Sequence, residues 1–422
     1  MKTVLPFDRK CKRKPIISGS SVETMEVDTR IEMIQALIPI ALTAVENELQ
    51  QEVIRLAGER YSRSGGQQGC YRWTRQKGSV YLGDKKVPVM VQRVRDARHN
   101  REVPLETYQK FQVPREADDG MMRRVLRGLS CRSYEACAEA VPGVFGLSAS
   151  TVSRRFIRAS AKRLQALEER DLSGHDFVAI FLDGKRFAED GIIIALGVTL
   201  KGEKVILGLT QASSENERVC REFLRKIVER GLSYKKGLLC VIDGSLGFKA
   251  AVQQVFGYHA RIQRCQWHKR ENVVSYLPKS QQAIFRKKLQ KAYASCTYEK
   301  AKAALNKIGE ELKAINLSAV ASLKEGFEET LTLHQLGLFK VLGESFKTSN
   351  CIESLMAQVG QRTDKVDYWK NSMQKQRWVA TALLDIEPRL RKVKGYRSLP
   401  LLQAALREEI QATEKQNQRE VA

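Results

Sequence analysis

Three short segments of the chain carry a carboxylate in a setting that suits chemistry. Asp183 lies in Phe-Leu-Asp-Gly-Lys, Asp243 in Val-Ile-Asp-Gly-Ser, and Glu353 in Ser-Asn-Cys-Ile-Glu-Ser. Each aspartate follows a run of apolar residues, so we expect it where a buried strand ends and side chains begin to reach solvent. Glu353 follows small polar residues and is expected near the start of a helix.

Two aspartates at the ends of neighbouring strands and a distant helical glutamate form a donor set for divalent metal ions. Mg²⁺ prefers oxygen ligands and keeps several waters, so a few carboxylates and a substrate phosphate complete its shell. Two such ions about 4 Å apart activate the attacking oxygen and stabilise the leaving oxygen of a phosphodiester. Gly184 and Gly244 follow the aspartates and allow a phosphate to approach closely. The pattern predicts a site for two ions, Mg²⁺ or Mn²⁺.

Each carboxylate also has a simpler interpretation. An Asp-Gly dipeptide after an apolar run is commonly a turn, and a glutamate near a helix start is favoured by the helix dipole. The order of strands and helices around the three residues, more than any one of them, favours the catalytic interpretation.

The charge of the chain indicates the kind of substrate. Its 422 residues carry 72 Lys and Arg against 48 Asp and Glu, a formal net charge of +24. An excess of this size favours polyanions and makes binding sensitive to salt, although ribosomal and membrane-surface proteins can be equally basic. The length predicts two to four domains. With the carboxylates, the charge favours double-stranded DNA as the partner.

The cysteines and the apolar segments indicate the compartment. The nine cysteines are odd in number and have no repeating spacing, which is typical of reduced thiols in a cytosol. No apolar stretch approaches the length needed to cross a bilayer, and the first residues lack an apolar signal region. We expect a cytoplasmic protein associated with the nucleoid and no membrane partner.

The first 115 residues are predicted to form a helical region and a basic β-hairpin. Residues 30–60 have helical periodicity, and alternating apolar residues flank a turn near Gly83-Asp84. Basic residues decorate this hairpin, which either lies on DNA or is a solvated surface.

Residues 116–172 are predicted to be a helix-turn-helix DNA-binding domain, in which the last helix enters the major groove. The alternative is an ordinary three-helix unit with a serine-capped helix. The candidate DNA contacts, small polar and basic residues at the start of the last helix, are Ser150, Thr151, Ser153, Arg154 and Arg155.

The remaining chain is predicted to be an α/β core of the ribonuclease H-like class, interrupted by an all-helical insertion. Residues 173–272 read as strands and helices in the order β-β-β-α-β-α-β. Residues 273–347 have helical composition, and residues 348–395 return to the core with Glu353. Residues 396–422 form a helical tail to which no chemistry is assigned.

These segments resemble the Mutator-type transposases of bacterial insertion sequences. The resemblance is carried by residues 181–185, by residues 241–251, by Arg-Cys-Gln-Trp-His-Lys-Arg-Glu-Asn at 264–272, and by residues 348–355. It covers most of residues 115–380. Where that family often has a basic residue seven positions after its glutamate, this chain has Gly360, with Arg362 nearby. The N-terminal hairpin region also departs from the family pattern, which leaves the specificity for DNA ends open.

The resemblance implies that Asp183, Asp243 and Glu353 are a DDE triad. It also implies that Cys265 and His268 are the family's Cys-x-x-His element, and that the helical block is its insertion domain. A zinc site is disfavoured because no second Cys or His pair accompanies this element. His268 either bonds a carboxylate or a phosphate at the active site or is a satisfied buried histidine.

Three further residues near these motifs have two interpretations each. Trp267 either stacks on a displaced base or fills the core. Lys185 and Arg186 either bind phosphate or are merely exposed.

The expected function is that of a DNA transposase, which binds the terminal inverted repeats of its element and catalyses metal-dependent strand cleavage and strand transfer. Because two ends must be handled together, a homodimer or larger assembly is expected. The rivals are a nuclease or junction resolvase of the same fold and a domesticated, non-catalytic DNA-binding regulator.

Overall fold

The computed structural model describes residues 27–61, 69–82, 85–112, 117–128, 149–212 and 216–421. By internal contacts the chain divides into two compact units, and the boundary falls within residues 121–153. The predicted hairpin turn at Gly83-Asp84 lies outside the described residues. Residues 129–148, which form the middle of the predicted helix-turn-helix domain at 116–172, lie outside them as well.

The N-terminal unit packs a long helix on a small antiparallel sheet. Helix α1 (Val27–Ala57) covers strands β1 (Cys70–Leu82), β2 (Lys85–Asp96) and β3 (Arg101–Val103), and helix α2 (Glu106–Gln112) follows. Glu52 is buried on α1, and its carboxylate accepts hydrogen bonds from the backbone N–H groups of Glu106 and Thr107, at 2.7 and 2.9 Å. A side chain of α1 therefore caps the start of α2.

The exposed face of this sheet carries basic and aromatic side chains. Trp73 is exposed on β1, and the guanidinium groups of Arg93 and Arg95 lie 4.3 and 4.7 Å from its ring centroid. The basic hairpin expected from the sequence is therefore present, with longer strands than the apolar alternation indicated.

Helices α3 (Ala117–Leu126) and α4 (Ala149–Glu168) lead into the larger unit, which is built on a five-stranded sheet. Its strands are β4 (Phe177–Phe187), β5 (Asp190–Thr199), β6 (Lys204–Gln211), β7 (Leu238–Ile242) and β8 (Ala260–Arg264), and the spatial order is β6-β5-β4-β7-β8. Strands β4, β5 and β6 form an antiparallel meander, and β7 and β8 join it in parallel.

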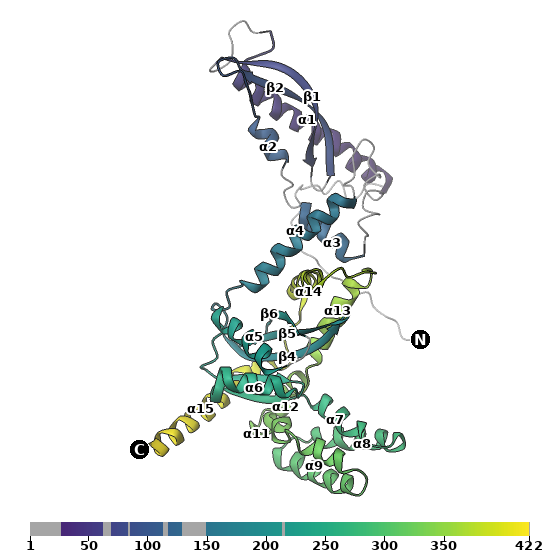
Figure 1. Cartoon of the computed structure of the whole chain (residues 1–422), viewed down its shortest axis with the longest axis vertical. Helices are drawn as coiled ribbons and strands as arrows, with labels where there is room; N and C mark the ends of the chain where they lie inside the picture. The colour runs from purple at the N-terminus through teal and green to yellow at the C-terminus, as the bar shows by residue number, and fades with distance from the viewer. Residues whose placement is uncertain are drawn as a thin grey trace. The chain divides into compact units, whose positions relative to one another are not determined.

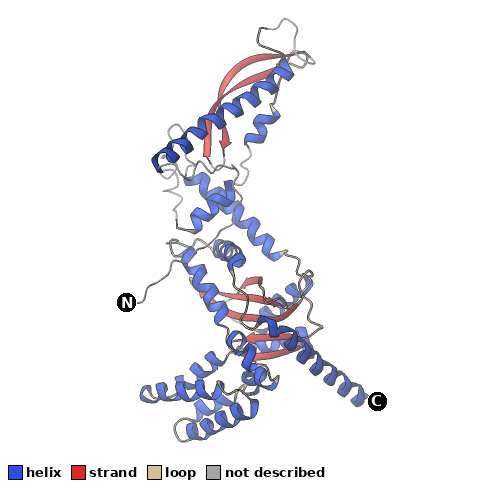
Figure 2. Ribbon diagram, turned by 180° about the vertical axis from the view of Figure 1, so that it is seen from behind, coloured by secondary structure: helices blue, strands red, loops and turns tan. Residues whose placement is uncertain are grey.

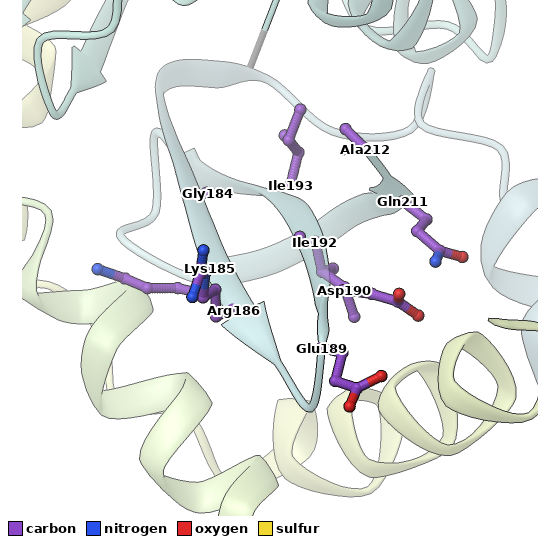
Figure 3. A pocket seen from close by; sticks show the side chains of 10 residues that line it. Gly184, Lys185, Arg186, Glu189, Asp190, Ile192, Ile193, Gln211 and Ala212 are labelled. Atoms are coloured by element: carbon purple, nitrogen blue, oxygen red, sulfur yellow. The ribbon is translucent and has the colours of Figure 1, made fainter. Parts of the chain in front are cut away.

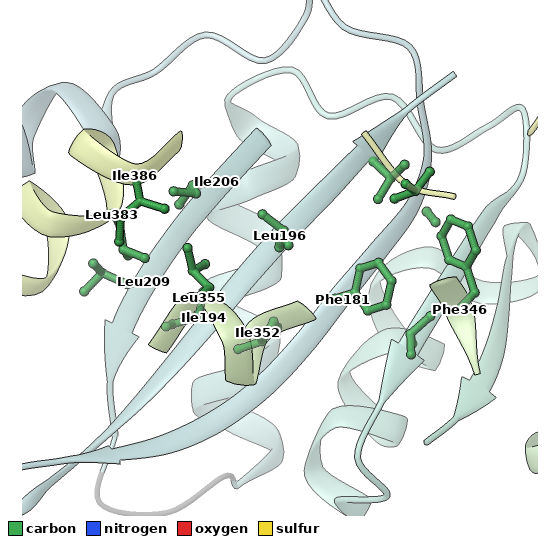
Figure 4. Packing of buried hydrophobic residues seen from close by; sticks show 14 of the residues in the cluster. Phe181, Ile194, Leu196, Ile206, Leu209, Phe346, Ile352, Leu355, Leu383 and Ile386 are labelled. Carbon is green, nitrogen blue, oxygen red and sulfur yellow. The ribbon is translucent and has the colours of Figure 1, made fainter. Parts of the chain in front are cut away.

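Helices cover both faces of this sheet (Figures 1 and 2). Helices α5 (Glu217–Glu229) and α6 (Leu246–Phe256) cover one face, and α13 (Asn350–Thr363), α14 (Ser372–Ile386) and the first half of α15 (Leu399–Val421) cover the other. This explains why the strands are nearly continuous apolar runs, as expected when both faces of a sheet are buried. Figure 4 shows Ile352 and Leu355 of α13 and Leu383 and Ile386 of α14 packed near the sheet.

A block of helices with its own core lies between β8 and α13. It comprises α7 (Gln266–Ser275), α8 (Lys279–Tyr293), α9 (Tyr298–Lys313) and α10 (Leu317–Lys324), followed by the short helices η4 (Glu328–Leu331), α11 (Thr332–Gln335) and α12 (Phe339–Phe346). Buried residues of α7 to α10, such as Leu289, Leu305 and Leu323, form a cluster separate from the two clusters on the sheet. Figure 1 shows α7, α8 and α9 grouped to one side of the sheet.

One strand differs from the sequence-based expectation in a way that matters for the site. The apolar run of β4 ends at Leu182, which predicted the strand end there, but β4 continues to Phe187 because its hairpin pairing with β5 continues to Phe187↔Asp190. Asp183 therefore lies inside the strand and is only 1% exposed. Asp243 follows the last residue of β7 as expected.

Candidate active site

The sheet places Asp183 and Asp243 side by side. Strands β4 and β7 are parallel neighbours, and Leu182 pairs with Ile242, so the two aspartates occupy the next position along each strand. Side chains alternate between the faces of a strand, and Phe181 and Val241, two residues earlier, both pack toward α13. Both carboxylates are therefore expected on the face that α13 covers.

Helix α13 carries Glu353 to the same place. Ile352, Leu355 and Val359 bury one side of the helix against the sheet, where Phe181 also stacks on Phe346 of α12 at 5.5 Å between ring centroids. Glu353 lies in the first turn of α13 and its side chain is 34% exposed. The packing of apolar side chains therefore fixes a glutamate from a distant part of the sequence beside the sheet.

Lys185 bridges the strand and the helix. Its ammonium nitrogen lies 3.2 Å from Oδ2 of Asp183 and 3.3 Å from Oε1 of Glu353. Lys185 is two residues after Asp183 on β4, so both side chains project from the same face. A cation therefore already stands between two of the predicted metal ligands.

A cavity of about 500 Å³ opens beside Lys185 at the end of the β4–β5 hairpin (Figure 3). Arg186, Glu189 and Asp190 also line it. Arg186 is exposed, and alternation along β4 directs it away from the face that Asp183 shares with Lys185. Of the two predicted phosphate ligands, Lys185 therefore belongs to the carboxylate cluster and Arg186 does not.

The Cys-x-x-His element holds the segment that precedes Glu353. Nδ1 of His268 lies 3.4 Å from Oγ of Ser349, and Sγ of Cys265 accepts a hydrogen bond from the backbone N–H of Ser349 at 3.4 Å. The other ring nitrogen of His268, Nε2, lies 3.5 Å from Oε1 of Glu353. His268 therefore contacts a predicted catalytic carboxylate directly, and burial lowers the pKa of its imidazole.

Burial dominates the electrostatics of Asp183. It raises the pKa of this carboxyl group to about 7, while nearby Lys185 lowers the pKa and the charge of Asp243 raises it further. Oδ2 of Asp183 is buried and contacts the ammonium nitrogen of Lys185 at 3.2 Å. A buried carboxylate is costly to keep charged, and carboxylates with a strongly raised pKa are often found at functional sites.

The donor chemistry of the cluster suits a divalent cation, but its present spacing does not form a closed metal site. Among the residues that the structure describes, no three His, Cys, Asp or Glu side chains stand close enough to hold one ion. The ammonium group already seated between Asp183 and Glu353 nevertheless shows that this position favours positive charge. The carboxylates therefore fit a cation that would take the place of the Lys185 ammonium.

Arg264 had no predicted role, but the structure places it at the site. It is 4% exposed at the end of β8, and its Nη2 donates to the backbone carbonyl of Gly244, next to Asp243, at 3.0 Å. The same guanidinium group forms a two-pronged ion pair with Glu325 at the end of α10, with N–O distances of 3.0 and 3.1 Å. Arg264 thus ties the turn after Asp243 to the helical block.

Two glycines and a lysine complete this attachment. A Cβ at Gly244 or at Gly326 would clash with the guanidinium group of Arg264, and both residues have positive φ, +120° and +61°. Lys269 is fully buried and donates to the carbonyls of Ser322 and Glu325, at 2.6 and 2.5 Å. The segment Arg-Cys-x-x-His at 264–268 was predicted to matter through its Cys and His, and no role was predicted for Arg264 or Lys269.

The remaining predicted DNA contacts lie on one helix. Ser150, Thr151, Ser153, Arg154 and Arg155 occupy the first two turns of α4. Ser153 and Arg154 are exposed and Arg155 is half-buried. Their helix exists as expected, and their role in DNA binding stays a prediction.

Comparison with known proteins gives the class of this chain. The family model described as "Transposase, Mutator family" matches residues 17–391. The chain therefore belongs to the Mutator family of transposases, enzymes that cut and join DNA.

Individual relatives agree with this assignment. The chain is 30% identical over 245 residues to the transposase for insertion sequence element IS6120 of Mycolicibacterium smegmatis, covering 56% of this chain and 74% of that one. It is 25% identical over 370 residues to the transposase for IS256 in transposon Tn4001 of Staphylococcus aureus, covering 82% and 88%. It is also 26% identical over 279 residues to the transposase for IS905 of Lactococcus lactis, covering 64% and 69%.

Within the described ranges, no helix is both long and apolar enough to cross a membrane. The six cysteines in those ranges, among them Cys265 and Cys351, form no disulfide with one another.

Proposed function

We propose that this chain is a DDE transposase whose ribonuclease H-like core cleaves DNA at the ends of its element and transfers the freed strand. The observation that carries the proposal is that the ammonium group of Lys185 joins Asp183 of β4 to Glu353 of α13, while the pairing of β4 with β7 sets Asp243 beside Asp183. The strand order, with three antiparallel strands followed by two parallel ones, supports the assignment of the core.

Asp183, Asp243 and Glu353 would hold two divalent ions, Mg²⁺ or Mn²⁺. When bound, such ions lower the pKa of a water nucleophile and neutralise charge at the phosphorus. The protein's own contribution is geometric. Burial fixes Asp183 within the sheet, the turn at Gly244 fixes Asp243, and Ser349, held by Cys265 and His268, sets the start of the helix that carries Glu353.

Lys185 and His268 act beside the carboxylates. Lys185 is 23% exposed and His268 22% exposed, so both can meet a phosphate that enters the site. In the absence of DNA the Lys185 ammonium offsets the repulsion between Asp183 and Glu353. With DNA bound, a phosphate oxygen is an alternative partner for the same ammonium.

Recognition of the terminal inverted repeats is assigned to the N-terminal half of the chain. The exposed residues at the start of α4 and the Arg93–Trp73–Arg95 stack on the small sheet are its candidate contacts. The chain would act as a homodimer or larger assembly, because both ends of an element must be brought together before joining.

The test is an assay with labelled duplexes that carry the inverted repeats flanking the gene, in Mg²⁺ or Mn²⁺. We expect strand cleavage and then joined products, and we expect Asp183→Asn to abolish both while end binding stays nearly intact. The matched control is Asp176→Asn, because Asp176 lies partly exposed just before β4, where its carboxylate pairs with Lys236 and stands apart from Lys185 and Glu353. Cleavage without joining would favour a nuclease or resolvase, and full cleavage by Asp183→Asn would remove this residue from the mechanism.

A further inference from the structure

Trp267 is exposed beside the carboxylate cluster, although its neighbours on α7 are buried. Its side chain is 39% exposed, whereas Gln266 is 4% exposed and Lys269 fully buried. An indole is among the largest apolar groups that a core can bury, so the interpretation of Trp267 as a core residue does not hold. Its ring instead meets the ring of His268 edge-on, at 4.8 Å between centroids.

Trp267 forms part of the wall of a cavity of about 670 Å³. Segments of α7, α8, α12 and the start of α13 surround it, and Trp267, Phe339 and Ala294 contribute apolar surface. The volume lies within the range of sites that enclose small organic groups. A flat aromatic surface beside such a volume suits a planar ring.

The charge around the cavity favours an anion next to that ring. Lys340 and Lys347 line it and form no ion pair with any residue that the structure describes. The one acidic lining residue, Glu344, is paired with Lys394. A ring that carries a phosphate group would therefore match both the aromatic and the basic parts of the lining.

The cavity adjoins the candidate active site. His268 is the residue after Trp267, and its Nε2 lies 3.5 Å from Glu353. Asn350 also lines the cavity and lies three residues before Glu353 on α13, where positions three apart share a helix face. A DNA strand whose phosphate meets the carboxylates therefore passes directly by the mouth of this cavity.

We propose that this cavity receives one unpaired nucleotide of the DNA strand beside the phosphodiester held at Asp183 and Glu353. Its base stacks on Trp267, and an adjoining phosphate lies near Lys340 and Lys347. Taking one base out of the duplex costs stacking and pairing free energy, and stacking on an indole offsets part of that cost without selecting a particular base. The inference rests on the proposed function, because it assumes that DNA occupies the carboxylate site.

The test combines a protein variant with a missing base. Binding and single-turnover cleavage are measured for wild type and Trp267→Ala on end duplexes with an abasic residue placed in turn at successive positions on either side of the scissile bond. On the intact duplex we expect Trp267→Ala to lose about 5- to 150-fold, the range that base–aromatic stacking gives. At one position the abasic residue should abolish this difference, because the base that Trp267 contacts is already absent.

Two variants separate stacking from damage to the fold. Trp267→Phe keeps an aromatic face and should retain most of the affinity, with an unchanged melting temperature. Tyr368→Ala removes another exposed aromatic residue, 76% exposed and outside the cavity, and should show no dependence on the abasic position. Losses for Trp267→Ala that are equal at every abasic position would overturn the proposal.

The phosphate part is tested by salt dependence. Lys340→Gln and Lys347→Gln should each reduce the slope of log affinity against log salt by about 0.7–0.9, and unchanged slopes in both variants would contradict that part. The two proposals fail differently. If wild type binds ends but never cleaves, the proposed function is wrong. If wild type cleaves and no abasic position couples to Trp267, only the cavity assignment is wrong.

Discussion

The burial of Asp183 predicts that this carboxylate destabilises the metal-free protein increasingly as the pH rises from about 4 to about 7. Its pKa is raised to about 7 in the folded chain, against about 3.9 for an unfolded aspartate. Below pH 4 both states hold the proton and nothing is lost. As the pH rises, the unfolded chain releases its proton first, so folding becomes less favourable until the folded group also ionises near pH 7.

The size of the effect follows from the shift of about three pKa units, at about 1.4 kcal/mol per unit. The penalty in wild type is about 1.5 kcal/mol at pH 5 and about 4 kcal/mol at pH 8. The unfolding free energy of Asp183→Asn minus that of wild type should therefore rise by about 2–3 kcal/mol over that range. Any constant cost of the amide, including the lost contact with Lys185, cancels in this comparison.

Thermal melts of wild type and Asp183→Asn at pH 5 and pH 8, in a metal chelator, measure the change. For a unit of this size each kcal/mol moves the melting temperature by about 2–4 °C, so Asp183→Asn should gain about 4–12 °C relative to wild type between the two pH values. Adding Mn²⁺ at pH 8 should raise the melting temperature of wild type and leave that of the variant nearly unchanged. If the melting temperature of Asp183→Asn minus that of wild type stays constant or falls between pH 5 and pH 8, burial does not raise the pKa of Asp183.

Three further predictions concern the surroundings of the carboxylates. His268→Ala should lose about 10- to 100-fold in the rate of single-turnover cleavage. His268→Gln should lose less, because its amide can still reach the carboxylate of Glu353. Equal losses in the two variants would argue that His268 does not position Glu353 through this contact. Glu325→Gln breaks the pair with Arg264 and should lower the unfolding free energy by roughly 2–3 kcal/mol in denaturant titrations. This is less than the usual cost of breaking a buried pair, because the side chain of Glu325 is half exposed. An unchanged unfolding free energy would show that water compensates for the lost carboxylate. Gly244→Ala should reduce the rate of cleavage more than the affinity for DNA ends, because its Cβ would displace Arg264 and the turn after Asp243. Adding Arg264→Ala to this variant should remove the clash, so the double variant should melt at a higher temperature than Gly244→Ala alone.

The parts of the fold that local sequence signals delimit were predictable. Strand β7 runs over Leu238–Ile242 as expected, because Gly237 and Asp243 bound a short run of apolar residues. Helix α8 also has its expected ends, with Pro278 immediately before it. Strand β4 was too short in the prediction because its last residues are polar, and only pairing with β5 keeps them extended.

The positions of the carboxylates followed from topology, whereas the contacts that surround them did not. Asp183 lies beside Asp243 because β4 and β7 are parallel neighbours and each aspartate follows the last paired residue, although only Asp243 lies at the end of its strand. The bridging of Asp183 by Lys185 depends on the rotamer of a long side chain, which no periodicity specifies. Arg264 was equally hidden, because it is one of 72 basic residues and only its burial distinguishes it.

The end of β8 and the start of α7 contact both the turn after Asp243 and the start of the helix that carries Glu353. The order of the strands explains why. Strand β8 is the parallel neighbour of β7, so its end reaches the same edge of the sheet as Asp243. From that edge Arg264 bonds the carbonyl of Gly244, and the next residue, Cys265, together with His268 one turn later, holds Ser349 at the start of α13. A short segment thus sets the distance between an aspartate on the sheet and the glutamate on the helix. Substitution of His268, which is 22% exposed and belongs to neither core on the sheet, should therefore change catalytic geometry before it changes folding.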